Sequence, residues 1–235
     1  VNEADAPKNM YELEILAKGL FNKARIIDIL QNFIVFEADS DGEVVSFTKK
    51  MGLYHQYYGV NNIVASTLRS VGGAQEHKIG VFWHTQGSGK SLSMVFYVNK
   101  TRRLTQLNNP AYVFLTDRED LDDQLHRLFK RVGYGHLAQR AETILDLRKK
   151  IKEFDMGASR LIFSTIQKFQ DYKDAFKDFS SRENIIVLAD EAHRTQYSGL
   201  AGNVRKALPN ASFLAVTGTP IAATDGRNTQ KVFGE

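Results

Sequence analysis

A strand-loop-helix pattern that begins at Ile79 constrains the fold of this chain more than any other feature. The apolar run Ile79–Trp83 ends abruptly in a loop that contains Gly87 and Gly89, and a helix-compatible stretch follows from Leu92. This order of strand, glycine-containing loop and helix is the context that a phosphate-binding loop requires. The pattern therefore predicts a binding site for phosphate where the strand gives way to the helix.

The residue types inside this loop suit phosphate chemistry. Gly87 and Gly89 can adopt backbone angles that residues with a Cβ avoid, so successive N–H groups can point at one anion. Lys90 supplies a mobile cation for the β- and γ-phosphates, and the Ser91 hydroxyl can ligate Mg²⁺. We therefore assign nucleotide binding to the whole loop, which comprises His84, Thr85, Gln86, Gly87, Ser88, Gly89, Lys90 and Ser91.

One position departs from the strict pattern of such loops. The pattern has a glycine five residues before the second glycine, where this sequence has His84. On this stretch alone, the alternative is an ordinary Gly/Ser turn.

A second motif favours nucleotide chemistry. Asp190 and Glu191 directly follow the strongly apolar run Ile185–Ala189. An Asp-Glu pair at a strand end is by itself usually just solvated, but after a Gly-Ser-Gly-Lys-Ser loop the combination indicates a nucleoside triphosphatase. We expect Asp190 to hold Mg²⁺ together with Ser91, and Glu191 to orient and polarise the attacking water, with Lys90 as its catalytic partner.

The amino-acid composition limits the classes of protein to which this chain can belong. With 235 residues and 43% hydrophobic residues, the chain can form one large domain, or one domain with a small appendage. The absence of cysteine excludes disulfides and thiolate metal sites and fits a cytoplasmic location. No apolar run approaches about 18 residues, so no membrane span is expected. The polar, acidic start at Val1 makes no signal peptide and hints at a fragment.

Charge is distributed unevenly along the chain. Residues 1–47 carry four basic and nine acidic side chains, which leaves 27 basic and 18 acidic side chains for residues 48–235. A basic domain is a candidate for nucleic-acid binding, although a solvated surface with a modest lysine excess is the alternative.

The pattern of apolar residues divides the chain at the same point. Residues 10–19 and 21–32 show helical spacing, and 33–36 and 44–47 predict a hairpin around the turn at 39–42. We interpret 1–47 as a packing or linking appendage. From 48 onward, a predicted helix over 49–71 precedes apolar strands at 79–83, 111–115, 161–163, 185–189 and 213–216, with helical stretches between them. This alternation predicts an α/β fold with a mostly parallel sheet and helices on both faces.

Five segments together resemble a known family, the motor (R, or HsdR) subunits of type I restriction enzymes, which are superfamily 2 translocases. They are HTQGSGKS at 84–91, TDREDLDDQ at 116–124, STIQKF at 164–169, DEAHRTQY at 190–197 and VTGTP at 216–220. Residues 19–36 also resemble the family's segment between nuclease and motor. In this family His84 is a normal occupant of its position.

The resemblance implies the first RecA-like lobe of a motor that uses ATP and Mg²⁺. Gln56 matches the family's adenine-reading glutamine; without the resemblance, an exposed glutamine on an aromatic-faced helix is the alternative. The resemblance further implies DNA contacts by Thr116, Arg118, Gln124 and Thr165, and coupling of hydrolysis to movement by His193, Thr217 and Thr219.

The implied partners are double-stranded DNA and the methylation and specificity subunits of the restriction complex. A second RecA-like lobe and a nuclease domain would belong to the same full-length chain. Two alternatives are another superfamily 2 helicase or remodelling ATPase, and a nucleotide-binding module without a motor role. ATP hydrolysis that depends on DNA, measured in the full-length protein, would distinguish a motor from a nucleotide-binding module without a motor role.

If Gln56 reads the base, this chain should bind ATP more tightly than GTP, because adenine presents an N6 amino group where guanine presents O6. Titration of the chain with both nucleotides measures the difference. Equal affinities would remove Gln56 from base recognition.

Overall fold

The computed structural model describes residues 11–41, 44–71, 77–85, 87–156, 161–169, 179–190, 197–218 and 233. Its helices are α1 (Glu12–Leu20), α2 (Lys23–Asn32), α3 (Tyr54–Val71), α4 (Lys90–Thr101), α5 (Glu119–Phe129), α6 (Ile144–Lys152) and α7 (Tyr197–Ala207), with short turns η2 (Thr105–Leu107), η3 (Lys130–Tyr134), η4 (Glu153–Met156) and η5 (Ile166–Phe169). Its strands are β1 (Ile34–Asp41), β2 (Val44–Met51), β3 (Lys78–Trp83), β4 (Ala111–Thr116), β5 (Ala138–Arg140), β6 (Leu161–Thr165), β7 (Ile185–Asp190) and β8 (Ser212–Thr217).

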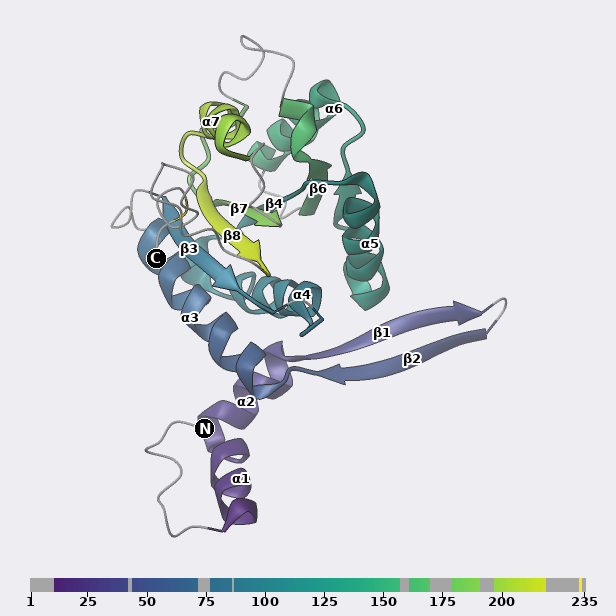
Figure 1. Cartoon of the computed structure of the whole chain (residues 1–235), viewed down its shortest axis with the longest axis vertical. Helices are drawn as coiled ribbons and strands as arrows, with labels where there is room; N and C mark the ends of the chain where they lie inside the picture. Colours follow the sequence, from purple (N-terminus) through teal and green to yellow (C-terminus); the bar gives the residue numbers. More distant parts are fainter. Residues whose placement is uncertain are drawn as a thin grey trace.

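Six of these strands form the central sheet, in the order β3-β8-β7-β4-β6-β5 (Figure 1). Every described pairing in this sheet is parallel. All carboxyl ends therefore meet at one edge, and this is the edge where ligands bind in open parallel sheets.

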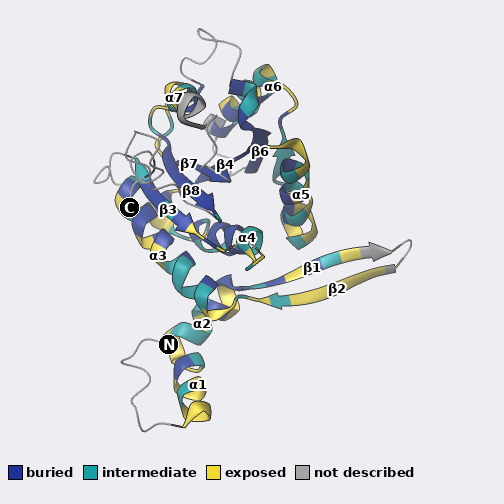
Figure 2. Ribbon diagram, in the orientation of Figure 1, coloured by how far each residue is buried: buried dark blue, intermediate teal, exposed yellow. Residues whose placement is uncertain are grey.

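Two separate cores cover the two faces of the sheet. Side chains from α3, α4 and α5 pack on one face, and those from α6 and α7 pack on the other. Figure 2 shows the strands in the middle of the central sheet as buried, and each residue of β4, β6, β7 and β8 is buried. The predicted mostly parallel sheet with helices on both faces is confirmed.

Two elements carry no clear signal in the sequence. The strand β5 has only three residues, two of which are the polar Gln139 and Arg140, so no apolar run marks it. The helix α7 contains two glycines, and its residues Val204 and Ala207 are buried in the second core. In addition, α4 begins at Lys90, two residues before the predicted start, because the backbone turns into the helix directly at Gly89.

The first two helices and the hairpin form an N-terminal unit beside the sheet domain, as the spacing predicts (Figure 1). The hairpin strand β2 runs on to Met51, and the ribbon projects away from the body. An ion pair of 2.6 Å between Lys100 and Asp28 ties α2 to α4, and the buried carboxylate of Glu37 pairs with Lys50 and Arg131. Phe33 adds an apolar contact, because its buried ring packs against that of Phe96 at a centroid distance of 5.5 Å. The N-terminal unit is thus anchored to the sheet domain by charged and by apolar contacts.

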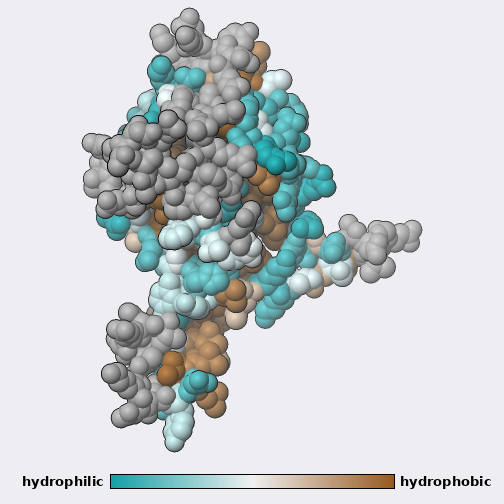
Figure 3. All heavy atoms as spheres, viewed as in Figure 1, coloured by the Kyte–Doolittle hydropathy of each residue, from teal (hydrophilic) through white to brown (hydrophobic). Residues whose placement is uncertain are grey.

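The outer surface of this unit is apolar. The exposed large apolar side chains between residues 11 and 54 are Tyr11, Leu13, Leu16, Phe21, Ile27, Leu30, Phe36, Val45, Phe47, Met51, Leu53 and Tyr54. Figure 3 shows hydrophobic residues gathered over the region of α1. Concentrations of this kind mark surfaces that contact another protein surface. Among the described residues, no helix is both long and apolar enough to cross a membrane.

Substitution of Phe114 by Ala should destabilise the sheet domain by about 3–5 kcal/mol, because it leaves a cavity in the core. Phe114 is 1% exposed, and its ring stacks on that of Phe163 with centroids 4.6 Å apart. Chemical denaturation of wild type and variant measures the loss. The matched control is Phe47→Ala, where the side chain is 66% exposed and the change should be within about 0.5 kcal/mol. Equal losses in the two variants would contradict the assignment of the core.

Candidate nucleotide-binding site

The predicted phosphate loop joins the end of β3 to the start of α4. Gly87 and Gly89 both lie in the left-handed region, with φ of 81° and 89°. A Cβ at position 89 would lie 2.8 Å from Nε2 of Gln56, so glycine is required there by space as well as by angle. No described side chain caps the N-terminus of α4, so none competes with an anion for its first N–H groups.

A chain of buried hydrogen bonds holds the loop from behind. Nε2 of Gln56 lies 3.1 Å from Oγ of Ser93, which lies 3.2 Å from Nε2 of His84. Nδ1 of His84 contacts Oγ of Ser88, whose hydroxyl also reaches the carbonyl of Thr85. The hydroxyl of Ser93 has two acceptors within reach, Nε2 of His84 and the carbonyl of Gly89, each at 3.2 Å. When it donates to Nε2, each group donates to the next, with a proton on Nδ1 of His84 and none on Nε2. This arrangement fits a neutral imidazole.

The environment of His84 favours the same neutral form. His84 is 5% exposed and packs against the rings of Phe82 and His55, at centroid distances of 5.0 and 5.3 Å. Burial, followed by the charges of His55 and Lys90, lowers the pKa of His84 below its usual 6.5. His84 occupies the position where the strict pattern has glycine, and its ring contacts Ser88 and Ser93. These contacts give a structural reason for the histidine.

Lys90 and Asp190 meet at the mouth of the loop. Nζ of Lys90 lies 2.8 Å from Oδ1 of Asp190, and both side chains are largely buried. The two residues come from the start of α4 and the end of β7, which are far apart in the sequence. Their contact brings the cation of the loop and the carboxylate of the second motif into one site.

The donor set at this edge fits a Mg²⁺ ion bound together with a nucleotide. Ser91 in the first turn of α4 offers a hydroxyl, and Asp190 offers a carboxylate. Mg²⁺ prefers oxygen ligands, is held by one or two protein groups plus phosphate oxygens, and keeps several waters. In the described part of the chain, no cluster of three or more His, Cys, Asp or Glu residues could hold a metal by itself. The residues present therefore suit a metal that arrives with the nucleotide.

Gln56 lies beside the loop, as its assignment requires, but its amide already has partners. Oε1 accepts from the N–H of Leu53 at 2.9 Å, and Nε2 donates to the carbonyl of Gly89 at 3.1 Å and to Ser93. The side chain is buried. To bind adenine, Gln56 would have to give up some of these hydrogen bonds. Its role in base recognition stays a prediction.

The residues assigned to DNA contacts lie at the carboxyl edge of neighbouring strands or on the helix that follows. Thr116 and Thr165 are register partners at the ends of β4 and β6, and both are buried. Arg118 precedes α5 and pairs with Asp120, and Gln124 is exposed on that helix. The structure brings these four residues to one region, and a role in DNA binding stays a prediction.

Two side chains that the sequence analysis missed support this edge. Nε2 of Gln167 reaches the carbonyl and, at 3.2 Å, the carboxylate of Asp117, which joins the segments after β4 and β6. Ser93 connects Gln56 to His84. Ser93 lies one turn beyond Gly89 on the same helix, and this spacing is the signal that could have identified it.

The last group of assigned residues is described only in part. Thr217 is buried at the end of β8, where its carbonyl accepts the N–H of His84 at 2.9 Å. Gln86, Glu191, His193 and Thr219 lie outside the described residues. Their assigned roles stay predictions.

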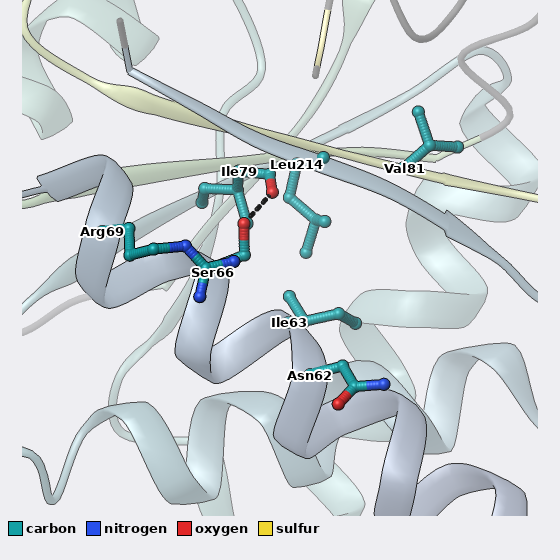
Figure 4. Close-up of a pocket in the computed structure, with 8 residues that line it drawn as sticks. Asn62, Ile63, Ser66, Arg69, Ile79, Val81 and Leu214 are labelled. Carbon is teal, nitrogen blue, oxygen red and sulfur yellow. Dashed lines mark hydrogen bonds between the residues drawn. The ribbon is translucent and has the colours of Figure 1, made fainter. Parts of the chain in front are cut away.

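A separate cavity of about 260 Å³ lies between α3, β3 and β8 (Figure 4). Its lining includes Asn62, Ile63 and Leu214, and the hydroxyl of Ser66 donates to the carbonyl of Ile79 at its wall. No residue of the phosphate loop lines this cavity, so it is distinct from the nucleotide site.

These features define the class of protein. The fold is a RecA-like parallel α/β domain, with its phosphate loop and Asp190 at one edge of the sheet. A sequence profile of the SWI2/SNF2 ATPases matches residues 55–235, and the chain belongs to this family.

The similar curated proteins are subunits of restriction enzymes. The chain is 41% identical over its whole length to the type I restriction enzyme HindI endonuclease subunit of Haemophilus influenzae. It is 44% identical, over 95% of its length, to a Methanocaldococcus jannaschii protein named as the MjaIXP endonuclease subunit of a type I restriction enzyme. The chain spans 23% and 20% of the lengths of these two relatives.

A solved structure has the same fold. The helicase domain of Pyrococcus furiosus Hef superposes with a TM-score of 0.51 over 78% of this chain and 38% of its own. The two sequences are 17% identical, so this similarity speaks for the fold alone.

The free energy of unfolding should fall as the pH drops from above 6.5 toward the lowered native pKa of His84. Between these two pH values, the imidazole is protonated in the unfolded chain and neutral in the native protein. Because the unfolded state binds more protons, the free energy of unfolding decreases as the pH falls. Urea unfolding at several pH values, with His84→Gln beside wild type, measures the effect.

The His84→Gln variant should lose this part of the pH dependence. Phe47→Ala is the control, because it changes an exposed side chain that does not titrate and should keep the wild-type slope. An unchanged slope in His84→Gln would show that the native imidazole is protonated as readily as in the unfolded chain.

Proposed function

We propose that this chain is the ATP-binding lobe of a DNA-translocating motor subunit of a type I restriction endonuclease. In this proposal ATP hydrolysis drives movement along double-stranded DNA before cleavage. The observation that carries the proposal is the 2.8 Å contact between Lys90 and Asp190 at the phosphate loop of a SWI2/SNF2 family chain. The names of the similar proteins, which are restriction endonuclease subunits, support the choice among motors.

Each residue of the site has a distinct part in the proposed reaction. The backbone of the loop and Lys90 bind the phosphates, and Lys90 exchanges Asp190 for them when ATP enters. Ser91 and Asp190 would hold Mg²⁺, which when bound neutralises charge on the phosphate oxygens. Glu191 would orient and polarise the attacking water. In this proposal the loop and Lys90 thus bind the nucleotide, and Glu191 orients the water that attacks it.

The proposed track is double-stranded DNA. The excess of nine basic side chains in residues 48–235 supports attraction to a polyanion. Thr116, Arg118, Gln124 and Thr165 are the proposed backbone contacts, and Thr217, with His193 and Thr219, would link hydrolysis to movement. The methylation and specificity subunits, a second RecA-like lobe and a nuclease domain are the proposed partners.

The N-terminal unit has a proposed role as the junction with other parts of the full-length protein. The boundary is drawn after residue 47, so that 1–47 is the appendage and 48–235 the motor lobe. The exposed apolar side chains between residues 11 and 54 support this role, because a folded protein tends to cover such a surface.

Substitutions in the site should separate binding from chemistry in the full-length protein. Lys90→Ala should lower both ATP affinity and turnover, because Lys90 contacts phosphate in the ground state and in the transition state. Glu191→Gln should keep ATP bound while turnover falls by at least about 10²-fold, because the amide keeps the shape but loses the charge. Asp190→Asn should weaken the Mg²⁺ dependence.

Nucleotide binding and DNA-stimulated phosphate release, measured for all three variants, test these roles. The exposed Phe47→Ala variant is the control and should match wild type in nucleotide binding and basal phosphate release. ATP hydrolysis by the Glu191→Gln variant at nearly the wild-type rate would contradict the assigned role of Glu191 and with it the proposed mechanism. ATP hydrolysis that does not respond to DNA would favour a nucleotide-binding module without a motor role.

A further inference from the structure

Trp83 is the one tryptophan in this sequence, and it lies at the last position of β3, directly before the phosphate loop. Its side chain is 68% exposed, whereas the preceding Phe82 is buried in the core. An indole so exposed gains little from packing, because the hydrophobic contribution scales with the area removed from water. A defined contact of this side chain is therefore to be sought in its N–H group rather than in its ring.

The indole N–H has a defined partner. Nε1 of Trp83 donates to the carbonyl of Gly218 at 2.9 Å. Gly218 directly follows β8, whose last residue, Thr217, is the register partner of Trp83. The hydrogen bond thus connects the entrance of the phosphate loop to the start of the Thr-Gly-Thr-Pro segment.

A second hydrogen bond runs beside it. The backbone N–H of His84 donates to the carbonyl of Thr217 at 2.9 Å. Successive carbonyls of a strand point in opposite directions, so the backbone of a neighbouring strand bonds only alternate ones. Gly218 lies just beyond the strand, and its carbonyl is bonded by the side chain of Trp83. The carbonyls of the last residue of β8 and of the residue after it are therefore held by two consecutive residues at the loop.

We propose that Trp83 is a positioning residue that transmits movement of the phosphate loop to residues 217–218. Binding of nucleotide displaces Lys90 from Asp190 and reorders the loop, and the indole pulls the carbonyl of Gly218 with it. The proposal rests on the proposed motor function, in which the segment after β8 links hydrolysis to movement. Trp83 touches no reacting atom in this role.

The first experiment observes the hydrogen bond itself in this 235-residue chain. A single tryptophan gives one indole N–H resonance, which needs no separation from others. Solvent exchange of this proton should be slower than that of N-acetyltryptophanamide, and addition of Mg²⁺ with a non-hydrolysable ATP analogue should shift both it and the backbone amide of Gly218. Exchange at the rate of the free indole would overturn the proposal.

The second experiment removes the donor. Trp83→Phe keeps an aromatic ring, and Tyr11→Phe is the matched control, because it removes a polar hydrogen from an exposed ring in a remote part of the chain. The shift of the Gly218 amide on nucleotide binding should disappear in Trp83→Phe and persist in Tyr11→Phe. Persistence of the full shift in Trp83→Phe would overturn the proposal.

The third experiment measures the consequence in the full-length protein. A single hydrogen bond shifts an equilibrium by about two- to tenfold, so Trp83→Phe should lower the DNA-stimulated kcat by that factor. The Kd for ATP should change less than about twofold. A purely structural loss would lower the unfolding midpoint and raise the Kd together. An unchanged DNA-stimulated kcat would overturn the coupling role.

The two proposals fail in different ways. If wild-type protein hydrolyses ATP without responding to DNA, the motor function fails, and the resonances of the indole and of Gly218 still decide whether Trp83 transmits the movement of the loop. If DNA stimulates wild type and Trp83→Phe equally, the motor function stands and the role of Trp83 fails.

Discussion

The burial of both faces of the parallel sheet is the constraint on which the rest of this structure depends. Strands covered on two sides must be apolar along their whole length, so the polar residues of the chain are displaced to the strand ends. Because the strands are parallel, those ends share one edge. The order β3-β8-β7 then places the phosphate loop, Thr217 and Asp190 on three adjacent strands, although their sequence positions are widely separated.

The loop at this edge is supported by polar contacts that are almost entirely internal. Gln56, Ser93, His84 and Ser88 form a buried sequence of donors and acceptors, and satisfied buried networks hold one geometry because any break leaves an unpaired group. The side toward solvent is different, since Lys90 is paired there with a carboxylate. In the proposed function, a nucleotide replaces that carboxylate at the front of a loop whose starting geometry is held by the network behind it.

The N-terminal unit follows another physical rule. It attaches to the sheet domain through the buried side chains of Ile29, Phe33 and Val35 and through ion pairs such as Lys100 with Asp28, while many of its other apolar side chains are exposed. A small unit of two helices and a hairpin buries too little apolar surface to stabilise itself independently. Its outward apolar surface and its charged anchoring are both consistent with a segment placed between larger bodies.

The sequence by itself determined most of the elements and the position of the glycine-containing loop between β3 and α4. Apolar runs such as Ile185–Ala189 and the glycines of the loop act locally, through periodicity and backbone angles, and these signals are readable without knowledge of the fold. The strand order, the short strand β5 and the contact of Lys90 with Asp190 were decided only by the tertiary structure. The physical reason is that packing selects which distant segments become neighbours, and no local pattern encodes that choice.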